Sequence, residues 1–411
     1  MKELSTEAYK GTRDFYPEDM AIQRYIFDTW AKTAESFGYE RYDASLLEPS
    51  ELYKSKGAEN EEMVNEQTYT FTDRGDREVT LRPEMTPTVA RMVAGRRREL
   101  SFPVRWYSIP NLFRYERPQR GRLREHWQLN CDMFGVDDVS ADIEMIQLAH
   151  SVLMAFGATP SMFRIKINNR ASLNEYLSKH NITSPESIRS VTSVIDRKAK
   201  VSAAEFAHIL KEAAGTDLSL PTETPESVMR VIEGLATLGI TNVEYDPSIV
   251  RGFSYYTGTI FEIFDISGEN NRSLIGGGRY DNLTSLFGGD PISGIGFGMG
   301  DVTMRDFLET HDLLPPSVRI TAPTVVIIPT DTSLNAQSLS IASLFRSFHI
   351  STSVDLSERK MGKKIGTASD RGATYIVVVG SNEIQTNHFT LKNLKTEEER
   401  SGTPEELAQQ A

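Results

Sequence analysis

Apolar and polar positions alternate along the chain with two different periods, and the changes of period indicate how it is organised. In the first 150 residues, apolar positions recur at helical spacing in two stretches, 22–38 and 140–157, each ending at a glycine. Between them lie segments of strand character, among them "VRWYSIPNLFRYE" and "EHWQLNCDMFGV". Several strands without regular helical crossovers predict an α+β fold with an antiparallel sheet flanked by helices.

The pattern then changes to consecutive helices, which predicts a helical insert over 169–240. One of these helices, 224–239, is expected to begin with Thr224 as N-cap and Pro225 in its first turn. Strand patterns return at 254–266, so the insert interrupts the sheet. A glycine-rich segment, "GGGRYD" (276–281), is expected to form a flexible turn.

A proline-containing segment, 313–323, predicts a linker to a second domain. Strands and helices alternate beyond it, as in a small α/β domain with a largely parallel sheet. Its last helix is expected to begin at Thr403, with Pro404 and Glu406 completing a capping box. We therefore expect one domain over 1–317 and another over 318–411.

Composition narrows the classes of function. The chain has 411 residues and a formal charge of -12, which argues against indiscriminate nucleic-acid binding. Cys131 is its only cysteine, so an intrachain disulfide and a thiolate metal site are both excluded, and its seven histidines lack metal-ligand spacing. No stretch approaches the ~20 apolar residues that cross a bilayer, and we expect a cytoplasmic protein without a membrane partner.

The strongest candidate site is "FRYERPQRGRLREHWQLNCD" (113–132), in which two extended runs flank a loop. Arg114 and Glu116 on one run, and Gln128 and Asp132 on the other, could share one face at period two. Arginine presents a planar donor fork suited to phosphate oxygens. The pattern indicates a polyphosphate site beside a small polar ligand, and a charged surface hairpin is the alternative.

Three weaker patterns add to this one. In "LRPEMTP" (81–87), the carboxylate of Glu84 and the hydroxyl of Thr86 suit an ammonium group, although Thr86 could equally cap a helix. "VRGFSYYTG" (250–258) places Arg251 near two tyrosines. "SGIGFGMGDVT" (293–303) carries glycine at every second position, which leaves one face of a strand open to another layer or to a ligand.

Together these residues carry a family resemblance. "FRYERP…GRLREHWQ" resembles motif 2, and "GIGFGMG" the glycine strand of motif 3, of the class II aminoacyl-tRNA synthetases. "GTRDFYP", "LRPEMTP", "VRGFSYYTGTIFE" and "GGGRYD" resemble the histidyl-tRNA synthetases within that class, in order over nearly the whole chain. The second domain is similar to that family's anticodon-binding domain.

The resemblance implies a function and a set of site residues. Histidine would be activated with ATP, accompanied by Mg²⁺, and transferred to tRNA-His by a homodimer with no editing domain and no protein-bound metal. Arg114 and Arg251 would hold the α-phosphate. The other implied nucleotide-site residues are Glu116, Arg122, Gly298 and Gly300. The implied histidine-binding residues are Glu84, Thr86 and Gln128 at the α-amino group, and Asp132, Tyr256 and Tyr280 at the imidazole.

Three positions depart from the family's pattern. Asp132 stands where glutamate is usual, Ser254 replaces an aspartate, and Thr303 occupies the place of the motif 3 arginine. Arg305 lies about 200° further round a helix, so it cannot simply replace that arginine. Two alternatives stay open: the regulatory subunit of ATP phosphoribosyltransferase, which shares the catalytic fold, and a tRNA-binding protein without catalysis.

Overall fold

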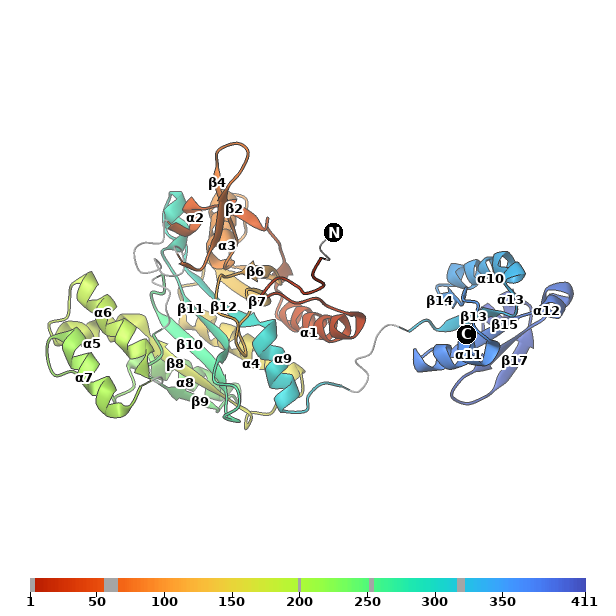
Figure 1. The fold of residues 1–411 in the computed structure, drawn as a ribbon. Helices are drawn as coiled ribbons and strands as arrows, with labels where there is room; N and C mark the ends of the chain where they lie inside the picture. Colours follow the sequence, from red (N-terminus) through yellow and green to blue (C-terminus); the bar gives the residue numbers. More distant parts are fainter. Residues whose placement is uncertain (1–3, 55–65, 199–200, 251–254, 316–321) are drawn as a thin grey trace. The chain divides into compact units, whose positions relative to one another are not determined.

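The computed structural model describes residues 4–54, 66–198, 201–250, 255–315 and 322–411 (Figure 1). Its contacts divide the chain into two compact units. The larger contains residues up to Phe15 together with Gln23–Pro315, and the smaller contains Pro316–Ala411 together with Tyr16–Ile22. Each unit has its own sheet and its own core.

The larger unit is built on a mixed sheet that, over the described residues, contains nine strands. Eight follow the order β1-β5-β7-β12-β11-β10-β8-β9, and β6 also pairs with β7. Parallel pairing occurs at its two edges, β1 with β5 and β8 with β9, whereas the other pairs are antiparallel. The predicted antiparallel sheet is confirmed at its centre. The strands are β1 (Glu40–Arg41), β5 (Val104–Ser108), β6 (Asn111–Phe113), β7 (Glu125–Phe134), β8 (Phe163–Asn169), β9 (Val243–Tyr245), β10 (Thr259–Asp265), β11 (Ser273–Arg279) and β12 (Gly294–Gly300).

The two amphipathic helices predicted in the first 150 residues and nearby are present as α1 (Pro17–Ser36) and α4 (Val139–Ala155). Each ends two residues before its glycine, and Gly38 and Gly157 have positive φ angles of 78° and 88°. Glycine takes such angles without steric cost, so it ends a helix readily. Helix α4 and helix α9 (Asp301–Thr310) both pack against β11 and β12.

A second, three-stranded sheet of order β2-β4-β3 lies in the same unit (Figure 1). It is followed in sequence by α3, whose residues Val89, Ala90 and Val93 are buried in a core with Phe134 and Tyr280. This packing fixes the turn before α3, which carries Glu84. The elements are β2 (Leu47–Pro49), α2 (Glu51–Lys54), β3 (Tyr69–Thr72), β4 (Glu78–Leu81), α3 (Thr86–Gly95) and the 3₁₀ helix η4 (Leu283–Phe287).

The predicted helices between β8 and β9 are α5 (Arg170–Lys179), α6 (Pro185–Asp196), α7 (Ala203–Ala214) and α8 (Glu226–Thr237). The first three pack around their own apolar cluster, and α8 packs against α4 and β8. The prediction of Thr224 as N-cap is wrong, because the N-cap is Pro225 and no side chain caps α8. The ring of Pro225 holds φ at -61°, so the chain enters the helix in a fixed direction without a side-chain cap.

The expected flexible turn at "GGGRYD" is also wrong, because Gly276, Gly277 and Gly278 lie inside strand β11. A Cβ atom on Gly277 would lie 2.7 Å from Cβ of Phe297, and one on Gly278 would lie 2.8 Å from Cδ1 of Tyr256. The glycines therefore serve close packing of neighbouring strands and rings rather than a turn.

The smaller unit contains, among the described residues, a five-stranded sheet of order β14-β13-β15-β16-β17. Three strands are parallel, as predicted, and β16 and β17 add an antiparallel edge. The capping box at Thr403 and Glu406 is confirmed. The elements are β13 (Val325–Pro329), η5 (Thr332–Leu334), α10 (Asn335–Ser347), β14 (Thr352–Val354), α11 (Met361–Asp370), β15 (Tyr375–Val379), α12 (Ser381–Thr386), β16 (Phe389–Asn393), β17 (Glu399–Gly402) and α13 (Pro404–Ala408).

Within the described part of the chain, we find no helix with the length and apolar character needed to pass through a membrane.

Candidate active site

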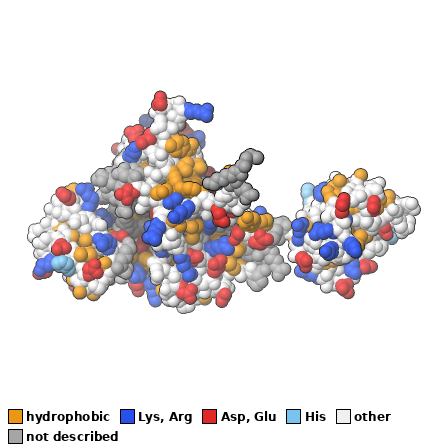
Figure 2. All heavy atoms as spheres, in the orientation of Figure 1, with side chains coloured by type: hydrophobic (Ala, Val, Ile, Leu, Met, Phe, Trp, Pro, Cys, Tyr) orange, Lys and Arg blue, Asp and Glu red, His pale blue; other side chains and the backbone are white. Residues whose placement is uncertain are grey.

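A cavity of about 800 Å³ opens on the main sheet of the larger unit. Its walls come from the loop before β7, from β7, β10, β11 and β12, and from the start of α9, and the end of α6 in the insert also contributes. Figure 2 shows a hollow between the insert and the rest of this unit. The cavity joins segments more than 180 residues apart in sequence, such as Arg114 and Gly300.

Six of the predicted site residues line this cavity. Arg251 lies outside the described residues. The six are Arg114, Glu116, Arg122, Gln128, Gly298 and Gly300.

The arginines of the cavity wall are held by specific contacts. Arg114 follows β6 and donates from Nε to the carbonyl oxygen of Pro83, at 2.9 Å. Nε of Arg122 lies 2.5 Å from Oε2 of Glu116, whose side chain is buried. Arg114 and Arg122 thus stand on the wall formed by the loop before β7 and by β7, where Glu116 is the acidic lining residue, and this wall suits an anion. The other acidic lining residues come from the insert and from β9, β10 and the segments that follow them: Asp196, Glu244, Asp246, Glu262 and Asp265.

The other predicted residues that the structure describes do not line this cavity, but contacts bring Glu84, Asp132, Tyr256 and Tyr280 close together. Asp132 on β7 is buried, and its Oδ1 accepts a hydrogen bond from the hydroxyl of Tyr280. Its Oδ2 is buried without a hydrogen-bond partner among the described residues. Burial raises the pKa of Asp132 to about 7, although the hydrogen bond from Tyr280 works in the opposite direction. A ligand with a polar hydrogen would satisfy this oxygen.

Glu84 and three tyrosines lie next to Asp132. Tyr255 donates from its hydroxyl to Oε2 of Glu84, at 3.2 Å. Its ring lies 4.8 Å from that of Tyr256 and 5.9 Å from that of Tyr280, measured between centroids. Thr86 is the first residue of α3, where the N-cap is Met85 and no side chain caps the helix, so a capping role for Thr86 is excluded.

Strand β12 forms the floor beneath these side chains. Gly296 pairs with Asp132, and Gly298 pairs with Asn130. A Cβ atom on Gly296 would lie 2.8 Å from the hydroxyl of Tyr280, and one on Gly298 would lie 2.7 Å from Cδ of Gln128. The alternating glycines thus let polar side chains from two neighbouring strands lie flat across β12.

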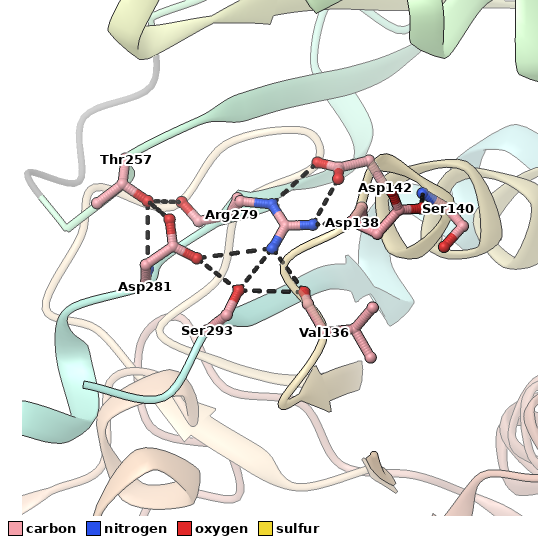
Figure 3. A network of polar contacts seen from close by, with 8 residues as sticks. All are labelled: Val136, Asp138, Ser140, Asp142, Thr257, Arg279, Asp281 and Ser293. Atoms are coloured by element: carbon pink, nitrogen blue, oxygen red, sulfur yellow. Dashed lines mark hydrogen bonds and ion pairs between the residues drawn. The ribbon is translucent and has the colours of Figure 1, made fainter. Parts of the chain in front are cut away.

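A polar network holds the residues on either side of Tyr280, Arg279 and Asp281 (Figure 3). Arg279 forms an ion pair with Asp142 of α4, and its Nη1 donates to Ser293 and to the carbonyl oxygen of Val136. Asp281 accepts from the hydroxyl of Thr257 at 2.6 Å. Because Thr257 follows Tyr256, the network fixes the backbone on either side of Tyr280 and next to Tyr256.

A family model described as histidyl-tRNA synthetase matches residues 11–301. The chain belongs to the histidyl-tRNA synthetase family. A second model, described as an anticodon binding domain, matches residues 324–410. The histidyl-tRNA synthetase match thus includes Asp132 and every residue that lines the cavity except Val302 and Thr303.

Curated relatives extend over nearly the full length. A histidine–tRNA ligase of Leptospira biflexa is 45% identical, covering 96% of this chain and 95% of its own. A histidine–tRNA ligase of Thermoplasma volcanium is 38% identical and covers 96% of both chains.

Solved structures share the fold. The apo histidyl-tRNA synthetase of S. aureus superimposes with a TM-score of 0.76 at 23% identity, covering 99% of each chain. A Bacillus halodurans structure, titled as an ATP phosphoribosyltransferase regulatory subunit/histidyl-tRNA synthetase, gives 0.69 at 21% identity and covers 92% of this chain.

Thr303, the departure from the histidyl-tRNA synthetase motif 3, lies in the first turn of α9 and donates to the carbonyl oxygen of Gly300, at 3.1 Å. Asp301 precedes it and is fully buried. It pairs with Arg13 at 2.7 Å, and it accepts from Gln23 and from the backbone N–H of Trp127. The start of α9 is therefore tied to the N-terminal segment and to β7.

Three residues of the site were missed in the sequence. Tyr255 contacts Glu84 directly, whereas the "YY" pair points only to its neighbour Tyr256. His126 lines the cavity, where partial burial and the charges of Arg114 and Arg13 lower its pKa to about 3. Its place two residues before Gln128 was the available signal. Arg272 also lines the cavity, with no motif to mark it.

Proposed function

We propose that this chain activates histidine with ATP and transfers it to the 3′ end of tRNA-His. One observation carries the proposal: a buried carboxylate oxygen without a partner, on Asp132, lies on the same strand as Gln128 and next to an arginine-lined cavity. A pocket for a small ligand with a polar hydrogen thus adjoins a site for a polyanion.

The reaction follows from this adjacency. A carboxylate oxygen of histidine attacks the α-phosphorus of ATP, the bond to the bridging oxygen breaks, and pyrophosphate leaves. A ribose hydroxyl of the tRNA then attacks the carbonyl carbon of the adenylate, and AMP leaves. Arg114 and Arg251 are proposed to stabilise the charge on the α-phosphate, and most of the catalysis is positioning.

The proposed amino-acid site would select histidine by hydrogen bonding. Glu84, Thr86 and Gln128 are proposed to bind the α-amino group. Asp132, oriented by Tyr280, would accept the imidazole N–H, with Tyr256 beside the ring. A pocket that hydrogen-bonds a polar group rejects analogues lacking it by ~10⁴ to 10⁵, which agrees with the absence of a predicted editing domain.

Mg²⁺ is proposed to enter with ATP. Among the described residues there is no group of three or more His, Cys, Asp or Glu that could hold a metal ion by itself. The cavity wall does include Glu262 on β10. Mg²⁺ is commonly held by one or two carboxylates and by substrate phosphates, so the carboxylate of Glu262 fits an ion carried by ATP. It would neutralise phosphate charge.

The paralogue alternative is less well supported. Relatives at 45% and 38% identity over 96% of the chain carry the name histidine–tRNA ligase. The match to an anticodon binding domain over residues 324–410 also favours tRNA engagement. Homodimerisation and a cytoplasmic location are part of the same proposal.

Histidine-dependent exchange between ATP and pyrophosphate, followed by charging of tRNA-His, tests the proposal. We expect both activities in the full chain, and Arg251→Ala is expected to abolish exchange while the melting temperature stays unchanged. Exchange that does not depend on histidine, or its complete absence, would overturn the proposal. Exchange by Arg251→Ala at the wild-type rate would show that another group holds the α-phosphate.

A further inference from the structure

The nucleotide end of the cavity has Thr303 where the family's pattern has an arginine, so a cation is missing from one wall. Another cationic side chain faces the same place. Arg272 lies in the connection between β10 and β11, directly before Ser273, and lines the cavity with Arg122 and Thr303.

Gly121 in the loop before β7 shows how close these side chains come. A Cβ atom on Gly121 would lie 3.1 Å from Cδ of Arg272 and 3.4 Å from Cγ2 of Thr303. Arg272 and Thr303, 31 positions apart, therefore border the same point of the loop. The φ of Gly121, +72°, is one that other residues rarely adopt, so the close approach is built into the loop.

The charge of Arg272 is poorly compensated by the protein. Its side chain is half-buried, and among the described residues it takes part in no hydrogen bond or ion pair. Partial burial and the charge of Arg122 lower its pKa, while Glu116 acts in the opposite direction. Glu116 is already paired with Arg122 at 2.5 Å. A half-buried guanidinium beside a second one is stabilised by a bound anion.

Other arginines near α9 have protein partners. Nε of Arg305 lies 2.8 Å from Oε1 of Glu309, on the same helix. Arg120 lies 4.0 Å from Glu269 and donates to the hydroxyl of Thr310. Neither Arg305 nor Arg120 is among the described residues that line the cavity, whereas Arg272 is.

We propose that Arg272 binds the triphosphate of ATP and supplies the cation that the family's motif 3 arginine supplies elsewhere. This inference rests on the proposed function for its choice of ATP as the anion. The positive charge would then come from Arg272 in the β10–β11 connection, on the other side of Gly121, instead of from the first turn of α9.

Arg272→Ala tests this in the full chain, with Arg272→Gln as a variant that keeps the length of the side chain. We expect the KM for ATP in histidine-dependent exchange to rise on the order of 10- to 100-fold, as for loss of one charge-assisted hydrogen bond to the bound triphosphate, with little change in the KM for histidine. Arg305→Ala is the matched control, and its KM for ATP is expected to stay at the wild-type value.

A rescue variant makes the test specific for position. Thr303→Arg, combined with Arg272→Ala, places a guanidinium on the other side of Gly121 and is expected to recover most of the lost affinity for ATP. If Arg272→Ala and Arg272→Gln both keep the wild-type KM for ATP, the inference is wrong. If Arg272→Ala loses affinity for ATP and the double variant does not recover it, Arg272 does not take the place of the motif 3 arginine.

Direct binding separates this inference from the proposed function. Calorimetric titration with a non-hydrolysable ATP analogue requires no histidine activation. If the wild-type chain binds the analogue and Arg272→Ala binds it on the order of 10- to 100-fold more weakly, Arg272 holds the triphosphate even where histidine-dependent exchange is absent. Equal binding by both proteins would overturn the inference whether or not exchange occurs.

Discussion

At the scale of single residues, Asp132 is the side chain with the most direct chemical consequence. One of its oxygens accepts from Tyr280 and the other has no partner among the described residues. Burial raises its pKa to about 7 from an ordinary value of 3.8. The carboxyl group therefore exchanges its proton close to neutral pH when the pocket holds no ligand.

We expect the KM for histidine to fall as pH rises through about 7, because the ionised carboxylate accepts the imidazole N–H in a charge-assisted bond. The KM should be measured from pH 5.5 to 8.5 in the wild type and in Asp132→Asn. The variant retains only the titration of free histidine, so the difference between the profiles reports Asp132. Superimposable profiles would contradict this role.

The same pKa has a consequence for stability. The folded protein keeps the proton on Asp132 up to about pH 7, whereas the unfolded chain loses it near 3.8. Since the folded state binds more protons in this range, the contribution of Asp132 makes the free energy of unfolding decrease as pH rises from about 4 to about 7. Denaturant unfolding of wild type and Asp132→Asn at pH 5 and pH 7 measures this contribution. The free energy of unfolding of the wild type minus that of the variant should be smaller at pH 7 than at pH 5, and a larger difference at pH 7 would contradict the expectation.

At the scale of elements, β12 determines what its neighbours can do. Its side-chain-free face allows Asp132 and Gln128 from β7, and Tyr280 after β11, to lie across it. A pocket made in this way depends on main-chain spacing, which small side-chain movements cannot adjust.

Gly296→Ala is therefore expected to destabilise the protein by about 1–3 kcal/mol and to raise the KM for histidine. The new methyl group would lie 2.7 Å from the carbonyl oxygen of Cys131 and 2.8 Å from the hydroxyl of Tyr280. Gly300→Ala is the stability control on the same strand, since its Cβ would lie 3.5 Å from Thr303 Oγ1. Thermal melting compares them, and equal melting temperatures would refute the expectation.

The elements also show how far the sequence alone leads. Helices α1 and α4 follow from apolar spacing, because one face of each must be buried. Local rules attribute glycine to turns and so predict a turn at "GGGRYD", whereas the glycines serve packing against Tyr256 and Phe297. The same local rules predict Thr224 as a cap. Helix boundaries at proline depend on how the chain enters the helix.

Within the site, motif spacing was sufficient to collect Arg114, Glu116 and Gln128 at one cavity. It could not find Arg272, because nothing local distinguishes this arginine from the other surface cations. Its proximity to Thr303 and Gly121 arises only when the β10–β11 connection meets the loop before β7. Contacts between distant segments are determined by the whole sheet, and a single sequence does not display them.

At the scale of the whole molecule, the two units suit separate tasks. The cavity lies in the larger unit, and the family model for an anticodon binding domain matches the smaller one. A chain of charge -12 needs local cations to meet tRNA phosphates. Figure 2 shows Lys and Arg side chains on the visible face of the smaller unit, and Lys360 and Lys363 are exposed at the start of α11, where the helix dipole favours anions.

Lys363→Glu is expected to raise the KM for tRNA-His in charging several-fold and to leave ATP–pyrophosphate exchange unchanged, since exchange needs no tRNA. Lys395→Glu, an exposed charge reversal in the turn after β16, is the matched control with smaller effect. Measuring both variants at two salt concentrations shows whether phosphate contact is lost. Identical tRNA kinetics for the two variants would exclude α11 as the contact.

Asp301 has a further consequence, which concerns the order in which the molecule is made. Its buried carboxylate pairs with Arg13 across 288 residues of sequence and contacts the N–H of Trp127 across 174. At about 5–20 residues per second, Arg13 leaves the ribosome roughly 15–60 seconds before its partner is synthesised. The N-terminal segment therefore lacks this partner during most of translation. The start of α9, with the nucleotide end of the cavity beside it, is among the last parts of the larger unit to fold.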